Sequence, residues 1–235
     1  MKQLGISVYP ESETASYWID TINFAANLGF TRIFSCLLSA KGDREEIESK
    51  FKPVFEAAQH RHMEVILDVA PAVFQHLGLS VDDLGFFKAL GVQGIRLDEG
   101  FDGLKEARMT FNPYGLKIEL NASILDGYLA NILSHQPKRS QLITCHNFYP
   151  QRYTGLGLSL FEKTTSAMKD HGLSVAAFVS SQEKTAIGPW PIREGLCTLE
   201  DHRDLPLDLQ VRHLAANDQI DAIIIANAPA SHEEL

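Results

Sequence analysis

The amino-acid sequence predicts an α/β fold, a (β/α)8 barrel of the TIM-barrel type. Three observations support this prediction: eight short apolar runs, helical patterns between them, and a spacing of about 30 residues that suits one strand plus one helix. Most of the runs are continuously hydrophobic, as expected when both faces of a parallel sheet are covered. A doubly wound open sheet is the second choice, because the units are regular and the sequence has no GxGxxG motif.

The eight predicted strands are distributed along the whole chain. They begin at Leu4, Thr31, Met63, Val92, Leu116, Gln141, Leu173 and Asp221. Successive starts are 24 to 32 residues apart, except for the last two, which are 48 residues apart. The extra length lies in residues 180–205, which are too many and too rich in turn signals for a plain connection.

Several predicted helices carry end signals. The first ends at Gly29, the second begins at Asp43 as its N-cap, and the third begins at Ser80. Only eight residues follow the last strand, and there Ser231 and Glu234 have the spacing of a capping box. The final helix of the barrel is therefore not accounted for: either it lies beyond this chain, or another segment covers that wall.

Composition limits the classes of function. The formal net charge is −9, and we find no basic stripe of the kind that nucleic-acid binders carry. Cys36, Cys145 and Cys197 are few and far apart, which argues against a disulfide framework and for a reducing compartment. No signal-peptide pattern and no run of about 20 apolar residues is present. We therefore expect a cytoplasmic protein with neither a nucleic-acid nor a membrane partner; a homodimer is left open.

The ends of the predicted strands carry the candidate site. In such barrels the active site forms at the carboxyl ends of the strands. The polar residues at these ends are Glu11, Asp68, Arg96, Asp98, Asn121, His146, Asn147, Tyr149 and Arg152. This mixture suits a carbohydrate, because rings stack on sugars, amides bind hydroxyl groups and paired carboxylates perform acid–base chemistry at an acetal. No metal site is expected, since no two histidines have i, i+4 spacing beside a carboxylate, and no cofactor is predicted.

Each candidate also has a plainer interpretation. Asp68 and Asp98 could anchor loops or pair with Arg96, and Arg96 shares a strand face with Asp98. His146 could be a hydrogen-bonded core histidine. Glu99, one step beyond Asp98, is more simply a solvated residue.

The connection at residues 180–205 follows the seventh predicted strand, where barrels often bind phosphate. Lys184, Arg193 and the backbone near Gly188 are candidate contacts for an anion. The alternative is a mobile surface loop with ordinary charges.

Six motifs occur in the same order as in one bacterial family: LGISVYPE, GIRLDEG, ELNAS, HNFYPQRYTGLG, REGLCTLEDHR and DAIIIANAPAS. On these motifs the chain resembles the 6-phospho-N-acetylmuramidases, also described as outer surface protein-like proteins. The resemblance implies a TIM barrel followed by a cyclophilin-like domain, so residues 1–235 would be the barrel and the second domain is absent from this chain. It also implies hydrolysis of the β-1,4 bond between 6-phospho-N-acetylmuramic acid and N-acetylglucosamine, in peptidoglycan recycling.

With this resemblance, we expect Asp98 to be the leading catalytic carboxylate, with Asp68 or Glu11 as its partner. The expected contacts with N-acetyl and hydroxyl groups are Asn121, His146, Asn147 and Tyr149. The expected contacts with the phosphate or lactyl group are Arg96, Arg152 and Lys184. The chain reads YPQR where the family commonly reads YPR, which displaces Arg152 by one position. The alternatives are a sugar-phosphate lyase or epimerase with His146 as base, and a non-catalytic carbohydrate-binding module.

Overall fold

The computed structural model describes residues 2–235 and confirms the predicted barrel. Eight parallel strands pair in chain order, and the last strand closes onto the first. They are β1 (Gln3–Ser7), β2 (Arg32–Cys36), β3 (Glu64–Val69), β4 (Gly94–Leu97), β5 (Lys117–Asn121), β6 (Leu142–Cys145), β7 (Val175–Val179) and β8 (Ala222–Ile225). Each strand begins within two residues of the predicted start.

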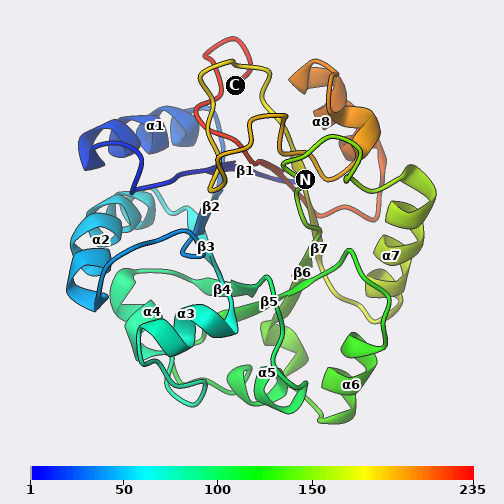
Figure 1. Cartoon of the computed structure of the whole chain (residues 1–235). Helices are drawn as coiled ribbons and strands as arrows, with labels where there is room; N and C mark the ends of the chain where they lie inside the picture. Colours follow the sequence, from blue (N-terminus) through cyan, green and yellow to red (C-terminus); the bar gives the residue numbers. More distant parts are fainter. Residues whose placement is uncertain (1) are drawn as a thin grey trace.

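Helices surround the ring of strands (Figure 1). They are α1 (Ala15–Asn27), α2 (Arg44–His60), α3 (Pro71–His76), α4 (Gly85–Leu90), α5 (Leu104–Met109), α6 (Tyr128–Ser134), α7 (Leu158–Asp170) and α8 (Leu207–Ala216). Short 3-10 turns lie at Arg139–Gln141 and Glu200–His202. Over residues 2–235, no helix has the length and apolar character that crossing a membrane requires.

The predicted helix ends are confirmed for the first two helices. Asp43 caps α2: its carboxylate accepts the backbone N–H of Glu46 at 3.0 Å, and Glu46 accepts the N–H of Asp43 at 3.1 Å. Gly29 follows α1 with a φ of 91°, a conformation that favours glycine. The third prediction was wrong, because α4 begins five residues after Ser80. The Ser80 hydroxyl accepts a backbone N–H two residues ahead and closes a turn instead of capping a helix.

No helix follows β8 in the part of the chain that the structure describes. The segment after β8 packs on the barrel instead: Leu235 contacts the core, and the ring of His232 stacks on Phe24 of α1 with centroids 4.2 Å apart. The N–H of Ser231 donates to the carboxylate of Glu234 at 3.0 Å, so this predicted pair forms but closes only a single turn. The segment therefore covers part of the wall beside α1 (Figure 1).

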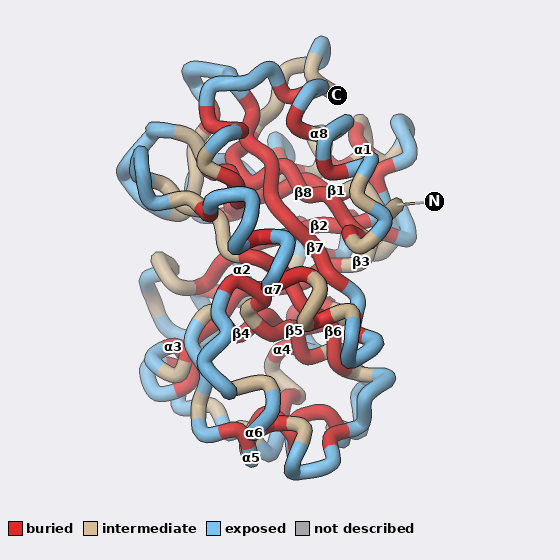
Figure 2. Tube along the Cα trace, turned by 90° about the vertical axis from the view of Figure 1, so that its right-hand side faces the viewer, coloured by how far each residue is buried: buried red, intermediate tan, exposed pale blue. Residues whose placement is uncertain are grey.

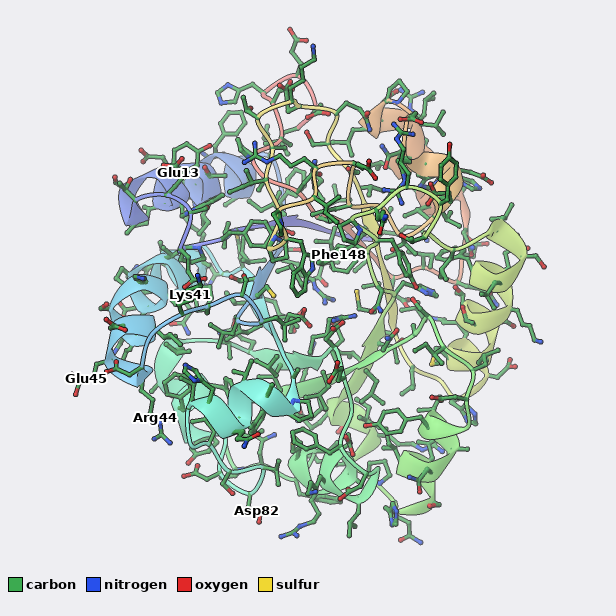
Figure 3. The ribbon with its side chains drawn as sticks, in the orientation of Figure 1. Glu13, Lys41, Arg44, Glu45, Asp82 and Phe148 are labelled. Carbon is green, nitrogen blue, oxygen red and sulfur yellow. The ribbon has the colours of Figure 1, made fainter. Side chains whose placement is uncertain are left out.

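The strands form the buried centre of the molecule, and the outer turns of the helices are exposed (Figure 2). Near the mouth of the barrel, the rings of Phe34 and Phe178 lie 5.0 Å apart. Phe148, which follows β6, packs edge-on against both, at 5.9 and 5.1 Å between centroids. It lies over the middle of the ring in Figure 3. Aromatic side chains therefore pack together at the centre of the mouth.

Candidate active site at the barrel mouth

Arg96 on β4 is the centre of a polar cluster at the mouth. Its Nη1 donates to Asp68 at 2.5 Å and to Asp98 at 3.0 Å, and its Nη2 donates to the side-chain oxygen of Asn147. The β3–β4 register places Asp68 directly beside Arg96, and strand alternation puts Asp98 on the same face as Arg96. The predicted pairing of Arg96 with Asp98 is confirmed, and the structure adds a second acid and an amide to it.

The two acids of this cluster differ in their surroundings. The side chain of Asp68 is 2% exposed, whereas that of Asp98 is 34% exposed. Burial raises the pKa of Asp68 to about 7; the charge of Arg96 opposes this rise, and that of Asp98 adds to it. Near neutral pH, Asp68 is therefore present in both protonation states, as acid–base catalysis requires. Asp98 is the acid that a ligand at the rim can reach.

The two carboxyl groups also lie close together. Since one Nη1 atom binds both, at 2.5 and 3.0 Å, the bound oxygens are no more than about 5.5 Å apart. Retaining glycosidases hold their two carboxyl groups roughly 5–5.5 Å apart, and inverting enzymes hold them roughly 6.5–9.5 Å apart. The upper bound for Asp68 and Asp98 lies below the separation of an inverting enzyme.

A hollow of about 300 Å³ lies beside Asp98, over the ends of β4 and β5, and we call it the β4–β5 hollow. Its polar lining consists of Asp98, Glu99, Asn121, Asp126 and Tyr128. Its apolar lining consists of Leu97, Phe101, Leu120, Ile124, Leu129 and Met168. Small-molecule sites combine an apolar wall with a few polar groups in this way, and the volume is at the lower end of their range.

The loop that carries Asp98 is held by Glu106 of α5, which the sequence analysis missed. This buried carboxylate accepts two backbone N–H groups of the loop, at 2.5 and 2.6 Å, and the hydroxyl of Tyr128. Gly100 is required here, since a Cβ at this position would overlap the Tyr128 hydroxyl. Gly103 and Glu106 have the spacing of a capping box, which could have identified Glu106 from the sequence. The pattern is hard to recognise because the cap position holds a glycine.

Three further predicted residues lie at the rim. Asn121 lines the β4–β5 hollow, and its side-chain oxygen accepts a backbone N–H of the following turn at 2.8 Å. Burial raises the pKa of the Tyr149 phenol, and the charge of Asp98 acts in the same direction, so Tyr149 keeps its proton. Glu11 is exposed on the β1 side, where its carboxylate accepts the N–H of Lys41 at 3.1 Å. It does not line the β4–β5 hollow.

His146 is not brought to the mouth. It is fully buried, with Nδ1 3.3 Å from Ser123 Oγ and Nε2 2.9 Å from Thr165 Oγ1 of α7, and its ring packs against Phe161. Burial lowers its pKa to about 3, so the ring is neutral. His146 is connected to the site only through Ser123. The hydroxyl of Ser123 contacts the His146 ring and accepts the backbone N–H of Asn147 at 2.8 Å. His146 therefore supports the site from behind the strand.

A second hollow, of about 200 Å³, lies over the ends of β7 and β8, and we call it the β7–β8 hollow. Four cations line it, Arg152, Lys184, Arg193 and Arg203, together with three acids, Glu183, Glu194 and Asp204. Arg152 donates to both carboxylate oxygens of Asp204, at 2.6 and 2.7 Å. Within residues 2–235, the side chains of Lys184 and Arg193 make no hydrogen bond or ion pair. The predicted anion contacts Arg152 and Lys184 thus share one hollow, away from Arg96.

Glu200 and Arg203 join the connections that follow β6 and β7. Glu200 accepts the backbone N–H groups of Tyr153 and Gly155, both at 2.8 Å, and the guanidinium of Arg203 at 2.7 Å. The Arg203 guanidinium and these N–H groups hold the pKa of Glu200 at about 2. Arg203 also donates to the carbonyl of Tyr149 at 3.0 Å. This network fixes the loop that carries Tyr149, and the sequence analysis did not identify it.

Comparison with known proteins identifies a family and similar solved structures, including two that share at least 30% of their sequence with this chain. A family model described as "6-phospho-N-acetylmuramidase, N-terminal" matches residues 4–235. An uncharacterized protein from B. cereus is 53% identical, with a TM-score of 0.89 over 99% of this chain and 63% of its own. A conserved protein of unknown function from Enterococcus faecalis is 31% identical, with a TM-score of 0.83 over 97% of this chain and 62% of its own.

The chain therefore spans less than two thirds of the length of both relatives. A truncated 3-deoxy-D-arabino-heptulosonate 7-phosphate synthase from Thermotoga maritima shares the fold alone, with 15% identity and a TM-score of 0.58 over 95% of this chain and 73% of its own. No curated protein matches the sequence.

Proposed function

Because the chain belongs to the 6-phospho-N-acetylmuramidase N-terminal family, we propose that it is the barrel of a glycosidase that cleaves the β-1,4 bond between 6-phospho-N-acetylmuramic acid and N-acetylglucosamine. The observation that carries the proposal is the pair of Asp68 and Asp98 on Arg96, at the strand ends and beside a hollow. We assign the reaction to peptidoglycan recycling in the cytoplasm.

In this mechanism, Asp98 is the carboxylate that meets the sugar, because it is the exposed member of the pair. Arg96 orients it by an ion pair of 3.0 Å, and a carboxylate held in this way suits a nucleophile or a stabiliser of the positive charge that develops on the sugar ring. Asp68 lies behind Asp98, and with a pKa of about 7 it is the member of the pair that holds a proton near neutral pH. Glu11, the other predicted partner, does not line the β4–β5 hollow and is the second choice.

The remaining predicted residues take supporting roles. Asn121, Asn147 and Tyr149 carry amide and hydroxyl groups at the rim and would bind the N-acetyl and hydroxyl groups of the substrate. Arg152 and Lys184 would face the anionic groups. His146 is left out of the substrate contacts, and the lyase or epimerase alternative loses its base with it, because both ring nitrogens are engaged behind β6.

The test is to incubate the chain with the phosphorylated disaccharide and follow the products by proton NMR. We expect equal amounts of 6-phospho-N-acetylmuramic acid and N-acetylglucosamine, and the anomer of the phosphorylated sugar that appears first shows whether the reaction retains or inverts. Calorimetric binding of the disaccharide without any product in a long incubation would contradict the proposal and support a carbohydrate-binding module.

A further inference from the structure

We infer that the disaccharide lies across the mouth in one orientation, with its phosphorylated sugar at the β7–β8 hollow and its neutral N-acetylglucosamine in the β4–β5 hollow. This inference rests on the proposed function, which does not itself fix where either sugar lies. It follows from the difference in charge between the two hollows, one lined by cations and acids and the other by acids alone among the charged residues that the structure describes, and from what already occupies the ends of β7 and β8.

The β7–β8 hollow is lined by four cations and three carboxylates, and two of the cations make no ion pair among residues 2–235. Arg152 is paired with Asp204, and Arg203 with Glu200, but Lys184 and Arg193 are exposed and without a partner among residues 2–235. A phosphate ester would form charge-assisted hydrogen bonds with both. Because the whole chain carries a net charge of −9, such local cations must provide the attraction.

The backbone donors at the ends of β7 and β8 are already occupied by an internal carboxylate. Glu234 accepts the hydroxyl of Ser181 at 2.6 Å, the N–H of Gln182 at 2.7 Å and the N–H of Ser231 at 3.0 Å. Many barrels bind phosphate with the loops after these two strands. In Figure 1 the yellow connection after β7 and the red segment after β8 meet at this place. The substrate phosphate therefore has to bind further out on the same connection, at Lys184 and Arg193.

The β4–β5 hollow excludes a phosphate and suits a neutral sugar. Its charged lining residues are Asp98, Glu99 and Asp126, and neither lysine nor arginine lines it. Bringing a phosphate dianion next to three carboxylates would be repulsive. The amide of Asn121 and the hydroxyl of Tyr128 offer hydrogen bonds to an uncharged pyranose, above an apolar wall.

The connection after β6 links the two hollows. The carbonyl of Tyr149 accepts a hydrogen bond from Arg203, which lines the β7–β8 hollow. Two residues earlier, Asn147 binds Arg96, the partner of Asp98 in the β4–β5 hollow. Phe148 fills the centre between them (Figure 3). A disaccharide that spans both hollows would thus place its glycosidic bond near Asp98.

Binding of separate probes tests the orientation without turnover. The first variant is Lys184→Ala/Arg193→Ala, with Lys50→Ala/Lys163→Ala as a control that makes the same charge change on exposed helix surfaces. Calorimetry should show that the dissociation constant for glucose 6-phosphate rises about 10- to 100-fold in the first variant only. The affinity for N-acetylglucosamine should stay unchanged in both.

The second variant, Ile124→Trp, fills the β4–β5 hollow from its exposed edge. We expect it to weaken N-acetylglucosamine binding at least about tenfold and to leave glucose 6-phosphate binding unchanged. Thermal melting confirms that each variant is folded. The orientation is overturned if wild type does not bind glucose 6-phosphate at millimolar concentrations, if the lysine–arginine variant binds it within twofold of wild type, or if Ile124→Trp weakens both probes equally.

The outcome is separable from that of the proposed function. If the disaccharide is hydrolysed but the double variant binds glucose 6-phosphate as wild type does, the inferred orientation is refuted and the proposed function stands. If both probes bind as expected but the disaccharide is not hydrolysed, the proposed activity is refuted and the two sugar-binding sites are retained.

Discussion

The protonation of Asp68 gives the sharpest physical prediction of the site. Burial and Arg96 act on this carboxyl in opposite directions, and its pKa of about 7 means that burial dominates. An unfolded aspartate has a pKa of about 3.9. The native state therefore holds this proton more tightly than the unfolded state does. At about 1.36 kcal/mol per tenfold change, the difference amounts to at most about 4 kcal/mol.

The sign of the effect follows directly. Below pH 4 both states carry the proton, and Asp68 contributes nothing to the pH dependence. Between about pH 4 and pH 7 the unfolded chain loses the proton while the native chain keeps it, so stability falls as pH rises. Asp68→Asn cannot titrate and lacks this fall. The free energy of unfolding of wild type minus that of Asp68→Asn should thus decrease by up to about 4 kcal/mol from pH 4 to pH 8.

Urea unfolding at four or five pH values measures this difference, and Asp20→Asn on the exposed face of α1 is the matched control, for which we expect a flat difference. If the wild-type minus Asp68→Asn difference grew with pH, the ion pair with Arg96 would dominate over burial. Asp68 would then be ionised at neutral pH, and its role as the proton-bearing carboxyl would have to be given up.

Three further predictions concern the supports of the site. Gly155→Ala would place a Cβ 2.6 Å from a carboxylate oxygen of Glu200, and should destabilise the protein by about 1–3 kcal/mol in urea unfolding; an unchanged midpoint would show that the loop has room. Glu234→Ala frees three donors, so inorganic phosphate should raise the melting temperature of this variant more than that of wild type, and an equal shift in both would contradict the filled-site argument. The ring protons of His146 should show no titration between pH 5 and 8 by NMR, because its pKa is about 3; a transition near pH 6.5 would refute its burial.

The fold could be predicted from the sequence because its signal repeats. Eight buried strands leave eight apolar runs, and no single run has to be interpreted correctly for the barrel to emerge. The capping pair at Asp43 is equally local, since both partners lie within four residues. Ser80 shows the limit of such signals, because its hydroxyl binds the backbone in a turn as readily as at a helix start.

The site could be predicted only in part. The strand-end rule located Asp68, Arg96 and Asp98, because their positions depend on the barrel alone. The sequence predicts that both His146 and Asn147 contact the substrate. Adjacent residues of an extended strand point to opposite faces, so only Asn147 faces the cluster around Arg96, and His146 points to α7. Glu106 was missed, because its loop partners become apparent only when the backbone is folded.

The electrostatic state of the site is a property of the folded protein. The pKa of Asp68 depends on how far burial outweighs one guanidinium, and no spacing in the sequence encodes that balance. The division of the mouth into an acidic hollow and one that holds cations is of the same kind, since Lys184 and Arg152 are 32 positions apart in the chain and share one hollow only through the fold.

The turnover of the phosphorylated disaccharide by Asp98→Asn, compared with Asp20→Asn, tests the central claim most directly. If Asp98 is the carboxylate that meets the glycosidic bond, its amide variant should lose about 10²- to 10⁴-fold in kcat, while Asp20→Asn keeps the wild-type rate. A rate for Asp98→Asn within a few-fold of wild type would contradict the assignment of this cluster as the active site.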